Sequence, residues 1–231
     1  GQIEPKVLFA ADGYLYKARP FDTRDKLAGI LAELPSVERV VLIPYADAEA
    51  QFEGAQTWNE FLGSDQAELF CQPVAFDHPL YILYSSGTTG KPKCIVHGHG
   101  GTLLQHLKEH QLHTDIRPGE KLFYFTTTGW MMWNWLVSVL ASGGTAVLFD
   151  GNPFFPGPEA LWKIVAEEEV EHFGTSAKYL DACKKAGYRP GAEQDLSALR
   201  SVLSTGSPLV PESFDWVYSE VKADLQLASI T

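Results

Sequence analysis

The side chains best suited to chemistry lie in one ten-residue segment that directly follows an apolar run. The segment is Tyr84-Ser85-Ser86-Gly87-Thr88-Thr89-Gly90-Lys91-Pro92-Lys93. Its glycines let the backbone turn tightly and present N–H groups to a ligand, its hydroxyl side chains add neutral donors, and its lysines add mobile positive charge. Together these features suit the binding of a polyphosphate.

This segment is not a Walker A loop. That motif requires G-x-x-x-x-G-K-[ST] at the start of a helix, whereas here Gly87 and Gly90 are three positions apart and Pro92 stands where Ser or Thr would hold magnesium. A plain surface turn is the alternative, because Gly, Ser, Thr and Pro are common turn residues. The strand-like run before the segment and the Lys-Pro-Lys sequence within it favour the phosphate loop.

The rest of the chain must supply the elements that position this loop. Short β-branched runs alternate with longer amphipathic runs, which predicts an α/β fold built on a doubly wound, mostly parallel sheet. Ligand sites in such folds lie at the carboxyl ends of the strands. The expected strands cover residues 7–10, 37–43, 81–84, 94–97, 121–125, 145–149, 172–174 and 199–204. The expected helices cover residues 23–34, 58–62, 101–113, 131–140, 159–168, 176–186 and 212–221.

Two sub-domains are expected. Breakers are frequent between Pro44 and Pro79, so we assign residues 1–79 to a partial α/β sub-domain with a connection, and residues 80–231 to an α/β sub-domain that carries the phosphate loop. The chain begins with Gly1 and stops in an apolar, strand-like stretch. We therefore expect an internal piece of a longer protein, with the second sub-domain truncated at its C-terminal end.

Composition excludes several classes of protein. The formal net charge is −11 and the pI is about 5.0, whereas duplex-binding proteins carry a basic face. The longest apolar run, residues 130–141, is broken by Asn134 and Ser138 and is short for a membrane span, which needs about 20 residues. The three cysteines form no C-x-x-C pair, so we expect reduced thiols in a cytosolic protein. From the charge and the apolar run we expect neither nucleic-acid binding nor membrane insertion.

The histidines at 106, 110 and 113 suggest a metal site, since they follow helical spacing. Zinc would need a fourth ligand or a water molecule, and Glu109 is rotated off their face. We therefore interpret the three histidines as a polar, solvated helix face and predict no metal ligands.

The phosphate segment resembles the signature of the adenylate-forming superfamily, which includes acyl-CoA synthetases, luciferases and peptide-synthetase adenylation domains. Cys94 departs from it, because many members have glycine after the lysine. The resemblance implies a carboxylate that attacks the α-phosphate of ATP, with Mg²⁺ present, and coenzyme A as the second acceptor. It also implies the residues that bind the ATP phosphates: Ser85, Ser86, Gly87, Thr88, Thr89, Gly90, Lys91 and Lys93.

Two later segments extend the resemblance. Residues 126–134 resemble the aromatic segment that lines the acyl pocket, which implicates Trp130, Met131 and Trp133. Core packing is the alternative for these aromatic side chains and for Trp135. The loop at 204–209 resembles the Gly-x-Pro segment that packs against adenine, through Thr205, Gly206, Ser207 and Pro208. Ser207 departs from the glutamate of acetyl-CoA synthetases.

The strings at 2–10, 128–134 and 150–153 resemble the acetoacetyl-CoA synthetase family. The resemblance implies the activation of acetoacetate to its CoA thioester, a ligase reaction of lipid and ketone-body metabolism. The alternatives are a synthetase for acetate or another short acid, and a non-catalytic nucleotide-binding or interaction protein. The family's next signature and its adenylation lysine are absent from these 231 residues, so we expect them to be inactive alone.

Overall fold

The computed structural model describes residues 2–63, 68–85 and 90–230. It divides into two compact units, Gly1–Cys71 and Gln72–Thr231. The sequence placed the division after residue 79, and the backbone places residues 72–79 with the second unit. There the carbonyl groups of Phe76 and His78 accept hydrogen bonds from Gly100 and His99.

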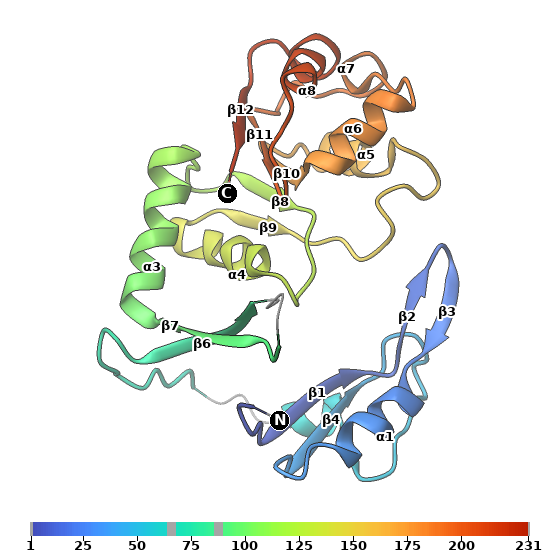
Figure 1. The fold of residues 1–231 in the computed structure, drawn as a ribbon, viewed down its shortest axis with the longest axis vertical. Helices are drawn as coiled ribbons and strands as arrows, with labels where there is room; N and C mark the ends of the chain where they lie inside the picture. Colours follow the sequence, from blue (N-terminus) through green and yellow to red (C-terminus); the bar gives the residue numbers. More distant parts are fainter. Residues whose placement is uncertain (1, 64–67, 86–89, 231) are drawn as a thin grey trace. The chain divides into compact units, whose positions relative to one another are not determined.

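The first unit is a small α/β layer around a three-stranded parallel sheet. Its order is β1 (Val7–Ala11), β4 (Arg39–Ile43) and β5 (Ala55–Thr57). Helix α1 (Arg24–Ala32) buries Leu27 against Leu42 and Ala50. A hairpin of β2 (Gly13–Tyr16) and β3 (Arg19–Asp22) extends from it, and α2 (Trp58–Leu62) begins with a capping box between Thr57 and Glu60 (Figure 1).

The second unit contains a five-stranded parallel sheet. The order of its strands is β12 (Gln226–Ser229), β11 (Ser201–Thr205), β10 (His172–Ser176), β8 (Lys121–Tyr124) and β9 (Thr145–Val147). A separate antiparallel hairpin, β6 (Pro79–Ser85) and β7 (Lys93–Gly98), precedes it. The mostly parallel, doubly wound α/β fold that the sequence predicted is therefore confirmed.

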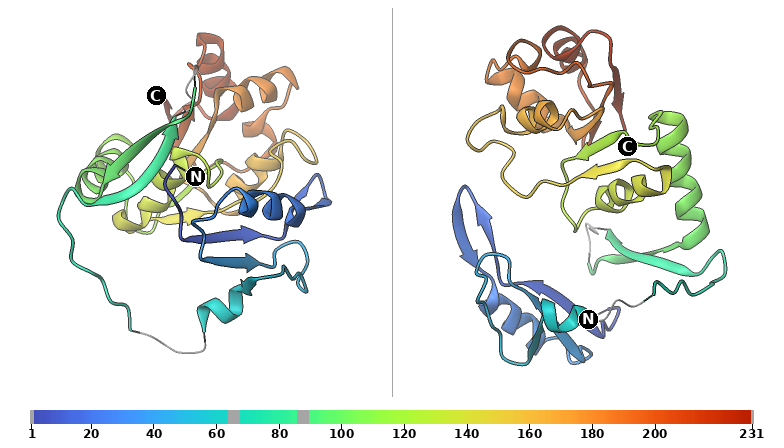
Figure 2. Two further views of the ribbon diagram at one scale, coloured as in Figure 1. Left: turned by 60° about the horizontal axis from the view of Figure 1, so that its bottom comes forward. Right: turned by 180° about the vertical axis from the view of Figure 1, so that it is seen from behind.

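Helices cover both faces of this sheet (Figures 1 and 2). Alternate residues of β8 point to opposite faces: Phe123 joins one apolar cluster, while Leu122 and Tyr124 join the other. The first cluster includes side chains of α5 (Ala160–Glu167), α6 (Ala177–Lys185), α8 (Pro211–Trp216) and the π-helical turn η3 (Val217–Val221). The second includes α4 (Met131–Val137) and the 3-10 turn η2 (Ser138–Ser142). The short helix α7 (Pro190–Glu193) follows α6.

The amino ends of the strands are linked by charged groups. His172, at the start of β10, is buried; its Nε2 lies 3.0 Å from Glu120 Oε2 and its Nδ1 lies 2.8 Å from Ser201 Oγ. Arg200 pairs with Glu120 and, at 2.6 Å, with Asp115. The carboxylate of Glu171 accepts the backbone N–H of Lys121 at 2.7 Å. We call these contacts the amino-edge network.

Helix α3 (His99–Lys108) continues into a π-helical turn, η1 (Glu109–His113). The expected solvated face of His106, His110 and His113 is wrong, because His106 and His110 are buried and only His113 is exposed. A π turn holds more residues than an α turn, so His113 rotates away from the other two. His110 Nε2 lies 3.0 Å from the carbonyl oxygen of Trp135 and 2.9 Å from Ser138 Oγ. This contact joins η1 to the end of α4.

Within the described ranges, no helix has the length and apolarity that crossing a membrane requires.

The burial of these histidines predicts a pH-dependent stability. Burial lowers the pKa of His110 to about 4, and it also lowers the pKa values of His106 and His172. The unfolded chain therefore takes up these protons first, near the ordinary histidine pKa of about 6.5. The free energy of unfolding should be highest above that pH and should fall as the pH decreases toward 4, by up to about 3 kcal/mol from His110 alone.

Urea denaturation at pH 7, 6 and 5 measures this dependence. Substituting Gln for His110 keeps a donor toward the Trp135 carbonyl group and removes the titrating ring, so it should reduce the drop in stability. The matched control is His113→Gln in the same turn, which should leave the drop unchanged. The titratable groups that interact electrostatically with His110 are His106, Glu109 and His172. An equal drop in all three proteins would contradict the assignment to His110.

Candidate functional site

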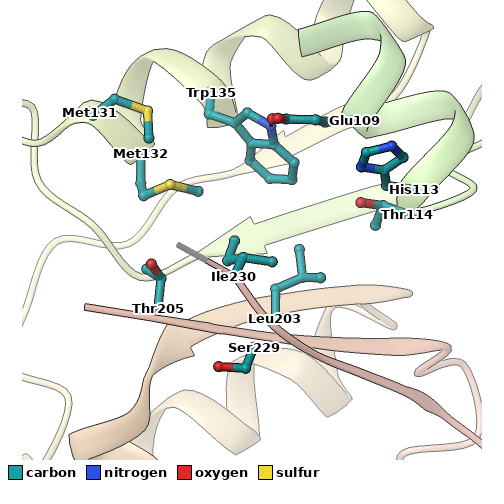
Figure 3. Close-up of a pocket in the computed structure, with 10 residues that line it drawn as sticks. All are labelled: Glu109, His113, Thr114, Met131, Met132, Trp135, Leu203, Thr205, Ser229 and Ile230. Atoms are coloured by element: carbon teal, nitrogen blue, oxygen red, sulfur yellow. Dashed lines mark hydrogen bonds between the residues drawn. The ribbon is translucent and has the colours of Figure 1, made fainter. Parts of the chain in front are cut away.

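A cavity of about 320 Å³ opens at the carboxyl ends of β11 and β12 (Figure 3). In a parallel sheet the carboxyl ends of neighbouring strands meet at one edge, and here Ser204 pairs with Ser229. Helix α4 and the turn η1 close the other side. The residues that line the cavity are Glu109, His113, Thr114, Met131, Met132, Trp135, Leu203, Thr205, Ser229 and Ile230.

The cavity brings together two of the residues expected from the sequence, Met131 and Thr205. Thr205 is the last residue of β11 and Met131 is the first of α4. The two lie 74 positions apart in the sequence (205 minus 131). The sheet edge therefore joins the segment expected to line the acyl pocket to the segment expected to contact adenine.

Trp130 and Trp133, the other two residues expected to line the acyl pocket, do not line this cavity. Trp133 lines a second cavity, of about 440 Å³, together with the Thr126–Thr128 run and Asp150. Trp130 precedes α4 and is 71% exposed. The helical period explains this division, because Met131 and Trp135 are four residues apart and share a face, whereas Trp133 points away from that face.

Trp135 is held in place by polar and aromatic contacts. Its Nε1–H donates to Glu109 Oε2 at 2.9 Å, and the other oxygen of Glu109 accepts a hydrogen bond from Gln105. The centroid of the indole lies 4.1 Å from that of the His110 ring and 5.8 Å from that of the Tyr124 ring. The side chain is buried, so these contacts fix its orientation in the wall of the cavity.

The expected phosphate segment begins at the end of β6 and finishes at the start of β7, where Ser85 and Lys93 face one another. Ser86, Gly87, Thr88 and Thr89 lie outside the described residues. Gly90 has a φ of +130°, a conformation that side-chain-bearing residues rarely adopt. Lys91 and Lys93 are exposed, so their ammonium groups are free to approach a phosphate.

The expected adenine loop follows β11. Gly206 has a φ of +87°, which favours glycine at this turn. Ser207 and Pro208 line a hollow of about 230 Å³ beside Lys178 and Asp181 of α6. Only Thr205 of this loop lines the larger cavity at the sheet edge.

Sequence reasoning did not identify most of the cavity lining. Trp135 had a usable signal, its i, i+4 relation to Met131. Ser229 could have been inferred from the strand-like end of the chain. Glu109 and His113 had none, because the π turn that orients them leaves no pattern in the sequence. Among the described residues, no three His, Cys, Asp or Glu side chains gather in a way that could hold a metal ion.

Comparison with known proteins gives a consistent result. The family model described as "AMP-binding enzyme" matches residues 1–228. An acetoacetyl-coenzyme A synthetase of Rhizobium meliloti (strain 1021) is 51% identical over 236 residues, a match that covers 100% of this chain and 36% of that protein. A malonamoyl-CoA synthetase of Penicillium aethiopicum is 41% identical over 254 residues, covering 100% of this chain and 35% of that protein.

The same similarity holds in three dimensions. The solved acetoacetyl-CoA synthetase from Streptomyces lividans superimposes with a TM-score of 0.93 and 49% sequence identity, over 99% of this chain and 36% of that chain. This chain thus spans about a third of the length of the relatives it matches. The resemblance found in the sequence is confirmed, and the chain belongs to the AMP-binding enzyme family.

Proposed function

We propose that this chain supplies the phosphate loop and the acyl pocket of an acid–thiol ligase that activates acetoacetate with ATP and coenzyme A. The observation that carries the proposal is the cavity at the carboxyl edge of the sheet, which joins Met131 to Thr205. The names of the relatives support the substrate. Acetoacetyl and malonamoyl groups share a carbonyl two carbons from the carboxyl group, so we infer that short 3-oxo acids are the substrate class.

In the proposed reaction, a carboxylate oxygen of the acid forms a bond to the α-phosphorus of ATP while the bond to the departing pyrophosphate breaks. The thiol of coenzyme A then forms the thioester and releases AMP. The first step brings two anions together, so cationic groups near the phosphates lower its barrier. We assign this role to Lys91 and Lys93, and the binding of phosphate oxygens to Ser85 and to the segment up to Gly90.

The cavity positions the acid. Met131, Met132 and Leu203 offer apolar surface for the carbon chain, while Thr114, Thr205 and His113 offer polar atoms for its oxygens. Holding the acid in one orientation lowers the entropic cost of the attack. We assign adenine to the loop from Thr205 to Pro208.

Mg²⁺ would accompany ATP. The described residues contain no cluster of three metal-ligating side chains, and no step of this mechanism depends on the ion. The described cysteines, Cys71, Cys94 and Cys183, are free thiols. This supports a reducing compartment, which we propose is the cytosol.

The proposal can be tested by replacing the matched region of the Streptomyces lividans enzyme with this chain and measuring ATP–pyrophosphate exchange. We expect exchange with acetoacetate to exceed exchange with acetate or butyrate. The 231 residues alone should give none, because they amount to about 36% of that enzyme's length. The unmodified enzyme is the positive control. Preference for acetate would favour the alternative synthetase, and a folded chimera inactive with every acid would favour a non-catalytic nucleotide-binding protein.

The phosphate loop can be tested on this chain itself by calorimetric titration with ATP. Removing the charge of Lys91 or Lys93 by substitution with alanine should weaken ATP binding about tenfold, equivalent to roughly 1.4 kcal/mol. Lys163, an exposed residue of α5, is the matched control, and Lys163→Ala should bind ATP as the parent does. Equal affinities for ATP in all three variants would contradict the assignment of Lys91 and Lys93 to the phosphate site.

A further inference from the structure

Two cavities of the second unit share part of their lining. The cavity at the sheet edge, defined above, has a volume of about 320 Å³. A further cavity, of about 510 Å³, lies between β7 and α3 and is lined by residues of both elements. Glu109, Met131 and Trp135 line both. These three side chains therefore form the partition between the two spaces.

We propose that Trp135, held by Glu109, is the wall that ends the acyl pocket and limits the length of the acid that the enzyme accepts. Trp135 is the specificity-determining residue in this proposal, and Glu109 is a positioning residue that acts through it. The inference rests on the proposed function, because it assigns the cavity at the sheet edge to the acid.

The contacts of the indole explain why it stays in the partition. Its single N–H donates to Glu109 Oε2 at 2.9 Å, and a buried donor left unpaired would be destabilising. The other carboxylate oxygen is also occupied, by the amide of Gln105, whose own oxygen accepts a hydrogen bond from Lys108 at 3.1 Å. Glu109 is thus fixed from two sides along one face of α3 and η1, and it fixes the indole in turn.

The ring faces of Trp135 are also covered. The His110 ring packs on it at 4.1 Å, tilted by 40°, and Tyr124 meets it edge-on at 5.8 Å. These contacts leave the indole little freedom to swing aside for a longer chain. A change in acid length therefore requires a change in the wall itself.

The cavity of about 510 Å³ lies on the other side of Trp135 from the acyl pocket. It is lined by the apolar side chains of Ile95 and Val96 and by the polar side chains of His97, Gln105 and His106. Within the described part of the chain, His106 Nδ1 is buried without a hydrogen-bond partner. Removing the indole would connect this space to the acyl pocket and make it available to the distal end of a longer acid.

The test uses the chimera described above and compares kcat/KM for 3-oxohexanoate with kcat/KM for acetoacetate, by pyrophosphate exchange. With Trp135→Ala we expect this ratio to rise about tenfold or more. One methylene group more or less in an apolar pocket changes kcat/KM by such factors. With Glu109→Ala the ratio should rise severalfold, because the indole loses its acceptor. The Glu109→Gln variant retains an acceptor oxygen and should keep the parent ratio.

Trp133→Ala is the matched control, because it removes an indole from the same helix on the side of the other cavity. Its ratio should stay within about twofold of the parent, well below the discrimination expected for a methylene group. Melting temperatures of all variants monitor folding, and Glu109→Ala carries the test if Trp135→Ala does not fold. If the Trp135 and Glu109 variants activate acetoacetate with an unchanged ratio of the two kcat/KM values, Trp135 does not limit the length of the acid. That result would leave the proposed function intact. An unsubstituted chimera without acetoacetate exchange would overturn both.

Discussion

The parallel pairing of β8, β10, β11 and β12 is the constraint on which the second unit depends. A parallel sheet must be covered on both faces, because its connections return as helices and its strands are apolar on both sides. The alternation of Leu122, Phe123 and Tyr124 between two apolar clusters is the direct result. The ends of the strands are not covered in this way. The carboxyl ends carry hydroxyl side chains, Thr205 and Ser229, and this is where the cavity forms.

Much of this arrangement could be predicted from the sequence. The β-branched runs located the strands of the second unit, and the amphipathic runs located most helices, because burial on both faces of a sheet leaves a strong periodic pattern. The position of the phosphate loop between two strands was also predictable, although its antiparallel hairpin was not. The β2–β3 hairpin was missed for a specific reason. Its turn is made by Lys17 and Ala18 with positive φ values of 49° and 59°, and neither residue is a usual signal for such a turn.

The candidate site was only partly predictable, because its lining depends on rotations about helix axes. Two of the three residues that were expected to line the acyl pocket, Trp130 and Trp133, lie away from the cavity at the sheet edge, whereas Trp135, which lay just outside the matched segment, lies in it. The π turn at Glu109–His113 adds a second rotation, which places Glu109 in reach of the indole and turns His113 away from His106 and His110. Neither rotation can be read from residue types alone.

The amino-edge network has a consequence for how such a protein can change over time. His172, Glu120 and Arg200 link neighbouring strands at the edge opposite the cavity, so the register of the sheet is secured where no substrate is expected. At the carboxyl edge the side chains of Thr205 and Ser229 line the cavity instead. Mutations there can accumulate and be selected for new acids while the scaffold persists, so stability and substrate choice can evolve at opposite ends of the same strands.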